Sequence, residues 1–140
     1  MNIVVVSGSK SGVGKTYVAQ ELLRHLSDWS ALKVTVSRKS GCPHERGCGI
    51  CPEIKEPFYI IKDAAIINQA GKDTAKLKIA GAKEVIWLKA KPEGLKAGLD
   101  KALLEFSDCD GVVIEGTSVL KFIKPDVNIH VYERGKFSVC

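Results

Sequence analysis

Several features are missing from this sequence of 140 residues, and each absence removes a class of protein. No apolar run approaches the roughly 18 residues of a membrane-spanning helix, so no membrane segment is expected. The first residues carry no basic stretch, so they do not resemble a signal peptide and indicate a cytoplasmic protein. Internal repeats, linkers and low-complexity segments are absent as well, so we expect a single domain over residues 1–140. The net charge of +5 is spread along the chain, which does not favour a nucleic-acid partner.

The segment from Ser9 to Thr16 predicts a phosphate-binding loop. It reads Ser-Lys-Ser-Gly-Val-Gly-Lys-Thr and directly follows an apolar run that is typical of a buried strand. Small residues let successive backbone N–H groups turn toward an anion, and the N-terminus of the following helix adds its partial positive charge. Lys15 can then reach the β- and γ-phosphates of a nucleotide, and the Thr16 hydroxyl can ligate Mg²⁺.

The sequence of this loop departs from the standard phosphate-loop motif, because Ser9 stands where the first glycine is usual. It fits better to a variant loop that reads Lys-Gly-Gly-x-Gly-Lys-Thr, in which the early lysine is a second phosphate-binding cation. That lysine is Lys10 here, so we assign Lys10 and Lys15 as the catalytic cations. The residues assigned to nucleotide binding in this loop are Ser11, Gly12, Val13, Gly14, Lys15 and Thr16.

Hydrophobic periodicity predicts alternating strands and helices along most of the chain. Strands are expected at 3–6, 33–37, 84–88, 112–115 and 127–132, and helices at 15–26, 73–80 and 92–106. Residues 60–67 fit either kind of element, and Asp73 is expected to cap the helix that Gly81 closes. This alternation predicts an α/β fold, a mostly parallel sheet flanked by helices, with ligands at the carboxyl ends of the strands.

Glu115 is a candidate magnesium ligand. It ends the apolar strand Gly-Val-Val-Ile and is followed by Gly116. At that place a carboxylate would lie beside the phosphate loop and hold Mg²⁺ directly or through water, together with Thr16. The alternative is a solvated acid at a strand end.

The phosphate loop, the Gly-Lys-Asp-Thr helix that ends in Ala-Gly-Ala, and the Val-Val-Ile-Glu-Gly strand end together resemble molybdopterin-guanine dinucleotide biosynthesis protein B. This family belongs to the class of P-loop NTPases that includes signal-recognition, MinD and dethiobiotin-synthetase-like proteins. The resemblance implies a homodimer that binds GTP and Mg²⁺, hydrolyses GTP weakly and assists a molybdopterin nucleotidyltransferase. It also places Asp73 near the nucleotide or the substrate.

Two departures limit what the resemblance implies. The family usually has a Lys-His pair after the second strand, and this chain has Arg38 and Lys39 there. No Asn/Thr-Lys-x-Asp motif for reading guanine stands out, since the related spacing at Lys124 and Asp126 precedes a strand instead of following one. The choice of GTP over ATP therefore rests on analogy alone.

An insert at about residues 40–57 is rich in Gly and Pro and contains four candidate ligands for Zn²⁺ or a [4Fe–4S] cluster, namely Cys42, His44, Cys48 and Cys51. The Cys48-x-x-Cys51 spacing is a common two-ligand arrangement for zinc and for clusters. Free thiols, or a redox pair at Cys48 and Cys51, are the alternative. Cys109 and Cys140 are interpreted as bystanders, although Cys140 could bridge two chains. His25 and His130 are interpreted as ordinary packing or surface residues.

The sequence thus favours a cytoplasmic nucleoside-triphosphate-binding protein, with GTP ahead of ATP, that assists assembly of the molybdopterin-guanine dinucleotide cofactor. A second hypothesis is a carrier or regulatory protein in which nucleotide state controls a zinc- or iron–sulfur-binding loop. A third, a small-molecule kinase or ligase akin to dethiobiotin synthetase, is less favoured because the chain is short and shows no evident substrate-binding lid.

Overall fold

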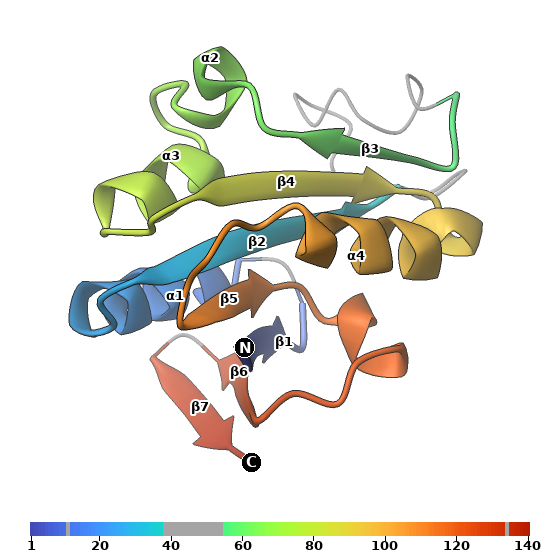
Figure 1. The fold of residues 1–140 in the computed structure, drawn as a ribbon. Helices are drawn as coiled ribbons and strands as arrows, with labels where there is room; N and C mark the ends of the chain where they lie inside the picture. Colours follow the sequence, from blue (N-terminus) through green and yellow to red (C-terminus); the bar gives the residue numbers. More distant parts are fainter. Residues whose placement is uncertain (11, 38–54, 134) are drawn as a thin grey trace.

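The computed structural model describes residues 1–10, 12–37, 55–133 and 135–140. Within these residues one sheet of seven strands forms, in the order β3-β4-β2-β5-β1-β6-β7 (Figure 1). The strands are β1 (Asn2–Gly8), β2 (Trp29–Val36), β3 (Phe58–Ile61), β4 (Val85–Ala90), β5 (Gly111–Glu115), β6 (Val127–Glu133) and β7 (Lys136–Val139). The five inner strands run parallel, and the edge strands β3 and β7 run antiparallel to their neighbours. The predicted α/β fold with a mostly parallel sheet is confirmed.

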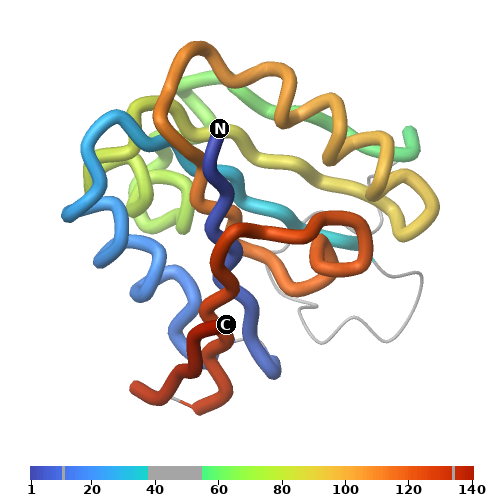
Figure 2. The backbone as a smooth tube through the Cα atoms, turned by 60° about the horizontal axis from the view of Figure 1, so that its bottom comes forward, coloured from blue at the N-terminus to red at the C-terminus, as the bar shows by residue number. Residues whose placement is uncertain are grey.

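Helices lie on both faces of the sheet (Figures 1 and 2). They are α1 (Lys15–His25), α2 (Ala64–Ile67), α3 (Asp73–Ile79) and α4 (Leu95–Leu104), with short 3₁₀ turns η1 (Pro92–Gly94) and η2 (Ser118–Lys121). Helices α1 and α3 cover one face, and α4 covers the other. In the part of the chain that the structure describes, no helix has the length and apolar character needed to cross a membrane.

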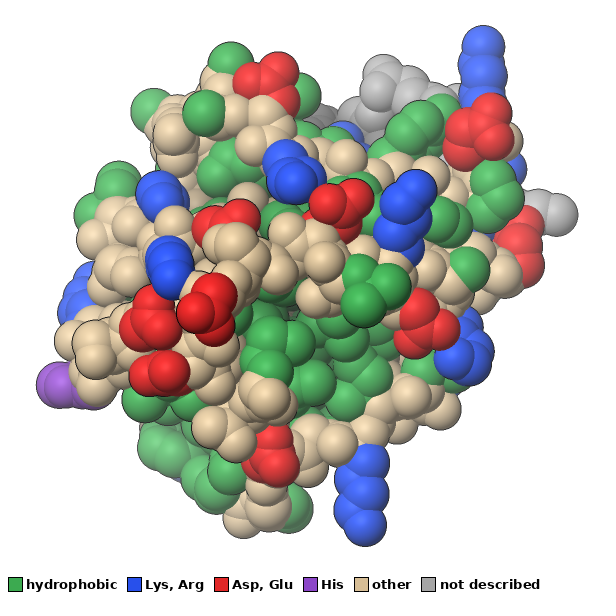
Figure 3. All heavy atoms as spheres, viewed as in Figure 1, with side chains coloured by type: hydrophobic (Ala, Val, Ile, Leu, Met, Phe, Trp, Pro, Cys, Tyr) green, Lys and Arg blue, Asp and Glu red, His purple; other side chains and the backbone are tan. Residues whose placement is uncertain are grey.

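Two hydrophobic clusters hold these layers together, one on each face of the sheet. Leu32, Leu88 and Ile114 point from the strands toward α4, where they pack with the fully buried Leu99. Their strand neighbours point the other way and pack under α1 and α3 in a second cluster that includes Val6, Ala19, Leu23, Ala31, Leu77, Val85 and Val113. Because alternate side chains face opposite layers and both layers are covered, most residues of these strands are apolar. Figure 3 shows the α4 face, with hydrophobic side chains gathered near its middle and charged ones around them.

The structure resolves one detail that the sequence left open and corrects three others. Residues 60–67 form neither one strand nor one helix, because β3 ends at Ile61 and α2 begins at Ala64. The strand β7 follows β6 and was not predicted, because its four residues are exposed and pair only along the sheet edge. The helix expected over 92–106 begins as the turn η1 and ends at Leu104. Asp73 does not cap α3, since Lys72 occupies that position and Asp73 begins the helix.

Because the inner strands are parallel, their carboxyl ends all lie on the same side of the sheet. The strand β1 lies between β5 and β6, and the chain leaves β1 through α1 to reach β2 on the β5 side. It later returns from β5 to β6 on the opposite side of β1. Such a reversal opens a crevice outside the carboxyl ends, where open α/β sheets bind ligands.

Candidate functional site

The loop after β1 requires glycine at two positions. Gly12 and Gly14 adopt φ angles of 79° and 104°, a left-handed conformation that costs other residues free energy and is open to glycine. Gly14 is also the residue that precedes α1, so the turn delivers the chain directly into the first helical turn. The predicted strand, loop and helix arrangement is therefore present. Ser11 lies outside the described residues.

The side chain of Lys15 folds back across the end of β1. A Cβ atom placed on Gly8 would lie 2.8 Å from Lys15 Cδ and 2.9 Å from Val13 Cγ2, so any larger residue would displace the lysine or the loop. Burial lowers the pKa of the Lys15 ammonium; the nearby Glu115 carboxylate raises it and Lys33 lowers it again, and the net direction is downward. The close approach to Gly8 shows that the Lys15 stem lies against the start of the loop.

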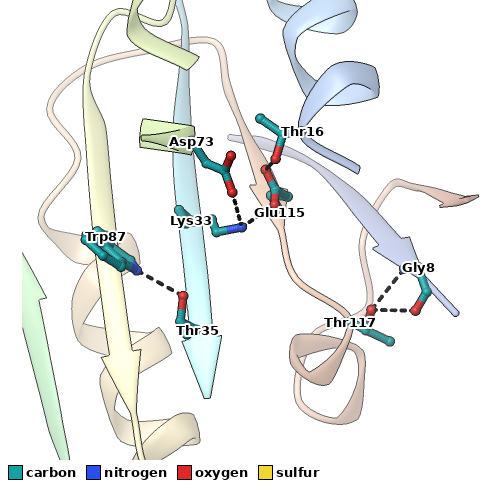
Figure 4. Close-up of polar contacts among 8 residues, drawn as sticks. All are labelled: Gly8, Thr16, Lys33, Thr35, Asp73, Trp87, Glu115 and Thr117. Carbon is teal, nitrogen blue, oxygen red and sulfur yellow. Dashed lines mark hydrogen bonds and ion pairs between the residues drawn. The ribbon is translucent and has the colours of Figure 1, made fainter. Parts of the chain in front are cut away.

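Glu115, the last residue of β5, meets the start of α1, where the sequence predicted it would lie. The Thr16 hydroxyl donates to Glu115 Oε1 at 2.8 Å, and the Glu115 side chain is 2% exposed (Figure 4). Pairing of β1 with β5 sets Val6 opposite Glu115, which brings the strand end beside the loop. The hydroxyl and the carboxylate proposed for Mg²⁺ are therefore in direct contact.

Sequence reasoning missed Lys33, the second partner of Glu115. Its ammonium donates to Glu115 Oε2 and, at 3.1 Å, to Oδ2 of Asp73 (Figure 4). The Lys33 side chain is only 18% exposed, and β2 pairs with β5 so that Lys33 lies directly opposite Glu115. The sequence did contain a signal for this role, because a lysine stands between Leu32 and Val34, and both of these neighbours are buried in β2.

Burial alone would lower the pKa of Lys33, because a charged ammonium loses hydration in the interior. The charge and the hydrogen bond of Glu115, followed by those of Asp73, outweigh burial and raise the pKa above its ordinary value. Lys33 therefore stays charged and links the two carboxylates. Asp73, which the resemblance placed near the nucleotide, is brought to the same site through this lysine.

Four further hydrogen bonds, two on each side, fix the position of the loop. The Thr117 hydroxyl accepts from the Gly8 amide at 2.9 Å and donates to the Gly8 carbonyl at 3.0 Å. On the other side, the Ser9 amide donates to the Val131 carbonyl at 3.1 Å and the Ser9 hydroxyl to the Tyr132 carbonyl at 3.0 Å. The beginning of the loop is thus tied both to the segment after β5 and to β6.

The row of side chains on this face continues from Lys33 to Trp87. These two residues lie opposite each other in the β2–β4 pair, and the Trp87 indole N–H donates to the Thr35 hydroxyl at 3.0 Å (Figure 4). The ammonium groups of Lys72 and Lys89 lie 5.0 Å and 4.2 Å from the centre of the Trp87 ring. A half-buried surface of mixed aromatic and cationic character therefore extends from Lys33 onto β4.

Asp126 lies far from this site. Its carboxylate accepts from the Ile3 amide at 2.8 Å, and its own amide donates to the Ile3 carbonyl at 2.9 Å. Ile3 is near the beginning of β1 and Gly8 ends it, so roughly 15 Å of strand separates Asp126 from the loop. The Lys124-x-Asp126 spacing therefore does not place a guanine-reading carboxylate beside the phosphate loop.

We predict that Asp126→Ala lowers the free energy of unfolding by about 1 kcal/mol, because the Ile3 amide loses its acceptor. Asp126→Asn keeps an acceptor oxygen and serves as the matched control. Urea denaturation measures the stability, and titration with GTP and ATP should give the same affinity ratio as the unchanged protein. A selective loss of GTP affinity would contradict the structural role.

The proposed ligands Cys42, His44, Cys48 and Cys51 all lie outside the described residues. Over residues 1–10, 12–37, 55–133 and 135–140, no three His, Cys, Asp or Glu side chains gather into a metal-binding group. Cys109 packs against the core, Cys140 is exposed, and His130 Nδ1 lies 2.9 Å from the Ser7 hydroxyl. These contacts fit the packing and surface roles expected for them.

Comparison of the sequence with known proteins found a curated relative of this chain. The chain is 30% identical over 122 residues to the ATP-dependent dethiobiotin synthetase BioD of Ruthia magnifica subsp. Calyptogena magnifica, an alignment over 86% of this chain and 54% of that protein. The chain thus spans about half the length of the curated relative that it matches. No family model matches the chain. A search of solved structures found no match either. This weak homology to an ATP-dependent enzyme supports nucleotide binding.

Proposed function

We propose that this chain binds a nucleoside triphosphate together with Mg²⁺ at the loop between β1 and α1. The observation that carries the proposal is the contact between the Thr16 hydroxyl and the buried Glu115 carboxylate, which lie beside Lys15. A helix N-terminus, a lysine and an acid at a neighbouring strand end supply what a polyphosphate and its metal ion need. The similarity to an ATP-dependent enzyme supports the same reading.

The donor set of the site fits Mg²⁺. This ion prefers hard oxygen ligands and usually takes one or two carboxylates in addition to phosphate oxygens and water. Thr16 and Glu115 offer a hydroxyl and a carboxylate, and Asp73 offers a second carboxylate that is 42% exposed. When bound, the ion would neutralise charge on the β- and γ-phosphates.

Each loop residue has a role in this proposal. The backbone amides from Gly12 to Thr16 surround the β-phosphate, and Lys15 contacts the β- and γ-phosphates. If the triphosphate is hydrolysed, a water oxygen attacks the γ-phosphorus, the bond from that phosphorus to the bridging oxygen breaks, and the diphosphate leaves. The water gives up a proton to the phosphate oxygens or to solvent. Lys15 and Lys10 would then neutralise the charge that develops.

We propose ATP as the first nucleotide to test. The relative is described as ATP-dependent, and Asp126 lies at the far end of β1, which removes the motif that came nearest to a guanine-reading sequence. Calorimetric titration with ATP and with GTP, each with and without Mg²⁺, tests the proposal. Binding of neither nucleotide would overturn it, and tighter binding of GTP would overturn the choice of base.

The molybdopterin-related function remains a prediction from the sequence motifs. The similarity to an ATP-dependent synthetase gives no support to a GTPase that assists a molybdopterin nucleotidyltransferase. The nucleotide-gated carrier remains a prediction as well, since its zinc or iron–sulfur ligands at 42–51 are outside the described residues. Metal analysis of protein purified without oxygen would test the carrier directly.

A second candidate function is an ATP-dependent ligase or kinase, the class that sequence reasoning favoured least. Two observations now support it. One is the similarity to a synthetase, and the other is the half-buried surface at Lys33 and Trp87, which offers an acceptor surface that begins beside Glu115. An acceptor bound there would receive the γ-phosphoryl group in place of water. Product analysis that separates inorganic phosphate from phosphorylated small molecules distinguishes the two functions.

We also propose that the chain forms a homodimer at the edge of the sheet formed by β6 and β7. Tyr132, Phe137 and Val139 on β6 and β7 are 48%, 53% and 59% exposed, and Ser9 is hydrogen-bonded to this same edge. Exposed apolar side chains at an edge strand favour pairing with another chain. Lys10 is exposed in this chain, so its side chain is accessible to a partner protomer.

If Lys10 acts in the partner's site, Lys10→Ala should lower hydrolysis and nucleotide-dependent dimerisation by about tenfold, with a smaller effect on nucleotide affinity. Sedimentation with a non-hydrolysable analogue measures the dimer. Lys121→Ala, which removes an exposed lysine from η2, is the control. A protein that stays monomeric with every nucleotide would rule out action across a dimer interface.

A further inference from the structure

Lys33 is an unusual residue for the middle of an inner strand. Inner strands of this sheet are apolar because both faces are covered, and an unpaired ammonium there would be strongly unfavourable. Lys33 is tolerated because Asp73 and Glu115 both accept hydrogen bonds from its ammonium (Figure 4). The site that would hold a metal ion thus already contains a cation supplied by the chain.

Three of the four carboxylate oxygens of Asp73 and Glu115 accept hydrogen bonds from Lys33 or Thr16. One oxygen of Glu115 accepts from Lys33 and the other from Thr16, while Asp73 gives one oxygen to Lys33. The two carboxylates carry a charge of −2, and Lys33 reduces the sum for the three groups to −1. The charge of Lys15, the residue directly before Thr16 at the start of α1, brings the sum for the four groups to zero.

A divalent cation gains little electrostatic binding free energy at a site whose charges already cancel. Phosphate groups would change this balance, because a triphosphate adds several negative charges and new oxygen ligands close to Thr16. The metal would then be held by the phosphates together with the protein. The carboxylates alone would hold it poorly.

We propose that Lys33 makes divalent-metal binding at Asp73 and Glu115 conditional on nucleotide, by neutralising the carboxylate pair. This inference rests on the proposed nucleotide and metal site. It gives a role to Lys33, which has no other assigned function. Lys33 acts through the two carboxylates, so it is a positioning residue. Replacement by an uncharged side chain should leave two adjacent carboxylates that bind a divalent ion without nucleotide.

The test uses Mn²⁺ alone as the probe, with the full chain and no nucleotide, and measures free Mn²⁺ by electron paramagnetic resonance. Lys33→Met should bind Mn²⁺ about tenfold more tightly than the unchanged protein. Lys33→Arg keeps the charge and should bind as weakly as the unchanged protein. The double variant Lys33→Met with Glu115→Gln should lose the gain, which assigns it to this carboxylate.

Equal Mn²⁺ affinity in Lys33→Met and the unchanged protein would overturn the proposal, as would tight Mn²⁺ binding by the unchanged protein. If Lys33→Met fails to fold, because two carboxylates then face each other without a cation, Mn²⁺ should restore its circular dichroism spectrum. Failure of Mn²⁺ to do so would also count against the proposal. The nucleotide titrations test the proposed function separately, so the two can fail independently.

Discussion

Lys15→Ala is expected to weaken binding of both ATP and GTP by roughly 30- to 1,000-fold, which corresponds to about 2–4 kcal/mol. The lysine begins α1, and its stem crosses the end of β1 at Gly8, so its ammonium is positioned before any ligand arrives. A cation that is already in place loses little side-chain entropy on binding and makes charge-assisted hydrogen bonds to phosphate oxygens. Alanine removes the charge and all of these contacts.

Calorimetric titration measures the loss for Lys15→Ala, and far-UV circular dichroism should show a native spectrum because the ammonium is not part of either hydrophobic cluster. Lys101→Ala is the matched control, since this exposed lysine lies on α4, on the opposite face of the sheet. Unchanged affinity for both nucleotides in Lys15→Ala would remove this residue from the site.

Glu115→Gln should weaken nucleotide binding in the presence of Mg²⁺ by roughly 10- to 100-fold and leave binding without Mg²⁺ nearly unchanged. The amide keeps the shape of the side chain and still accepts a hydrogen bond from Thr16, but the negative charge that attracts the ion is gone. A smaller loss of stability is also expected, because Lys33 keeps Asp73 as a partner but loses its more buried one.

Titrations with Mg²⁺ and with EDTA separate the metal-dependent part of this effect, and thermal unfolding records the change in stability. Glu105→Gln removes an acid whose ion pair with Lys62 is exposed, so it controls for the change in net charge. Equal losses with and without Mg²⁺ would mean that Glu115 serves the fold or the phosphates directly instead of the metal ion.

Local patterns in the chain were enough to predict the parts of the fold that depend on short-range spacing. The apolar run before Ser9, the loop glycines and the helical periodicity after Lys15 lie within 25 residues of one another, and the structure has the strand, turn and helix where they were expected. The edge strand β7 escaped prediction because its residues are exposed and show no buried face. The helix cap was misplaced by one residue for a different reason, since the Asp73 carboxylate bonds to a distant lysine instead of its own helix.

The sequence by itself determined the loop, its lysine and the acid that follows a buried strand, because each of these is a residue type at a definite place in a local pattern. Only the tertiary structure decided which residues surround them. Thr16 and Glu115 are 99 positions apart, Lys33 and Glu115 are 82 apart, and Lys33 and Asp73 are 40 apart. Strand order and register bring these residues together, and both depend on how two hydrophobic clusters pack on opposite faces of one sheet. A lysine in an apolar strand becomes a site residue only when that packing places two carboxylates beside it.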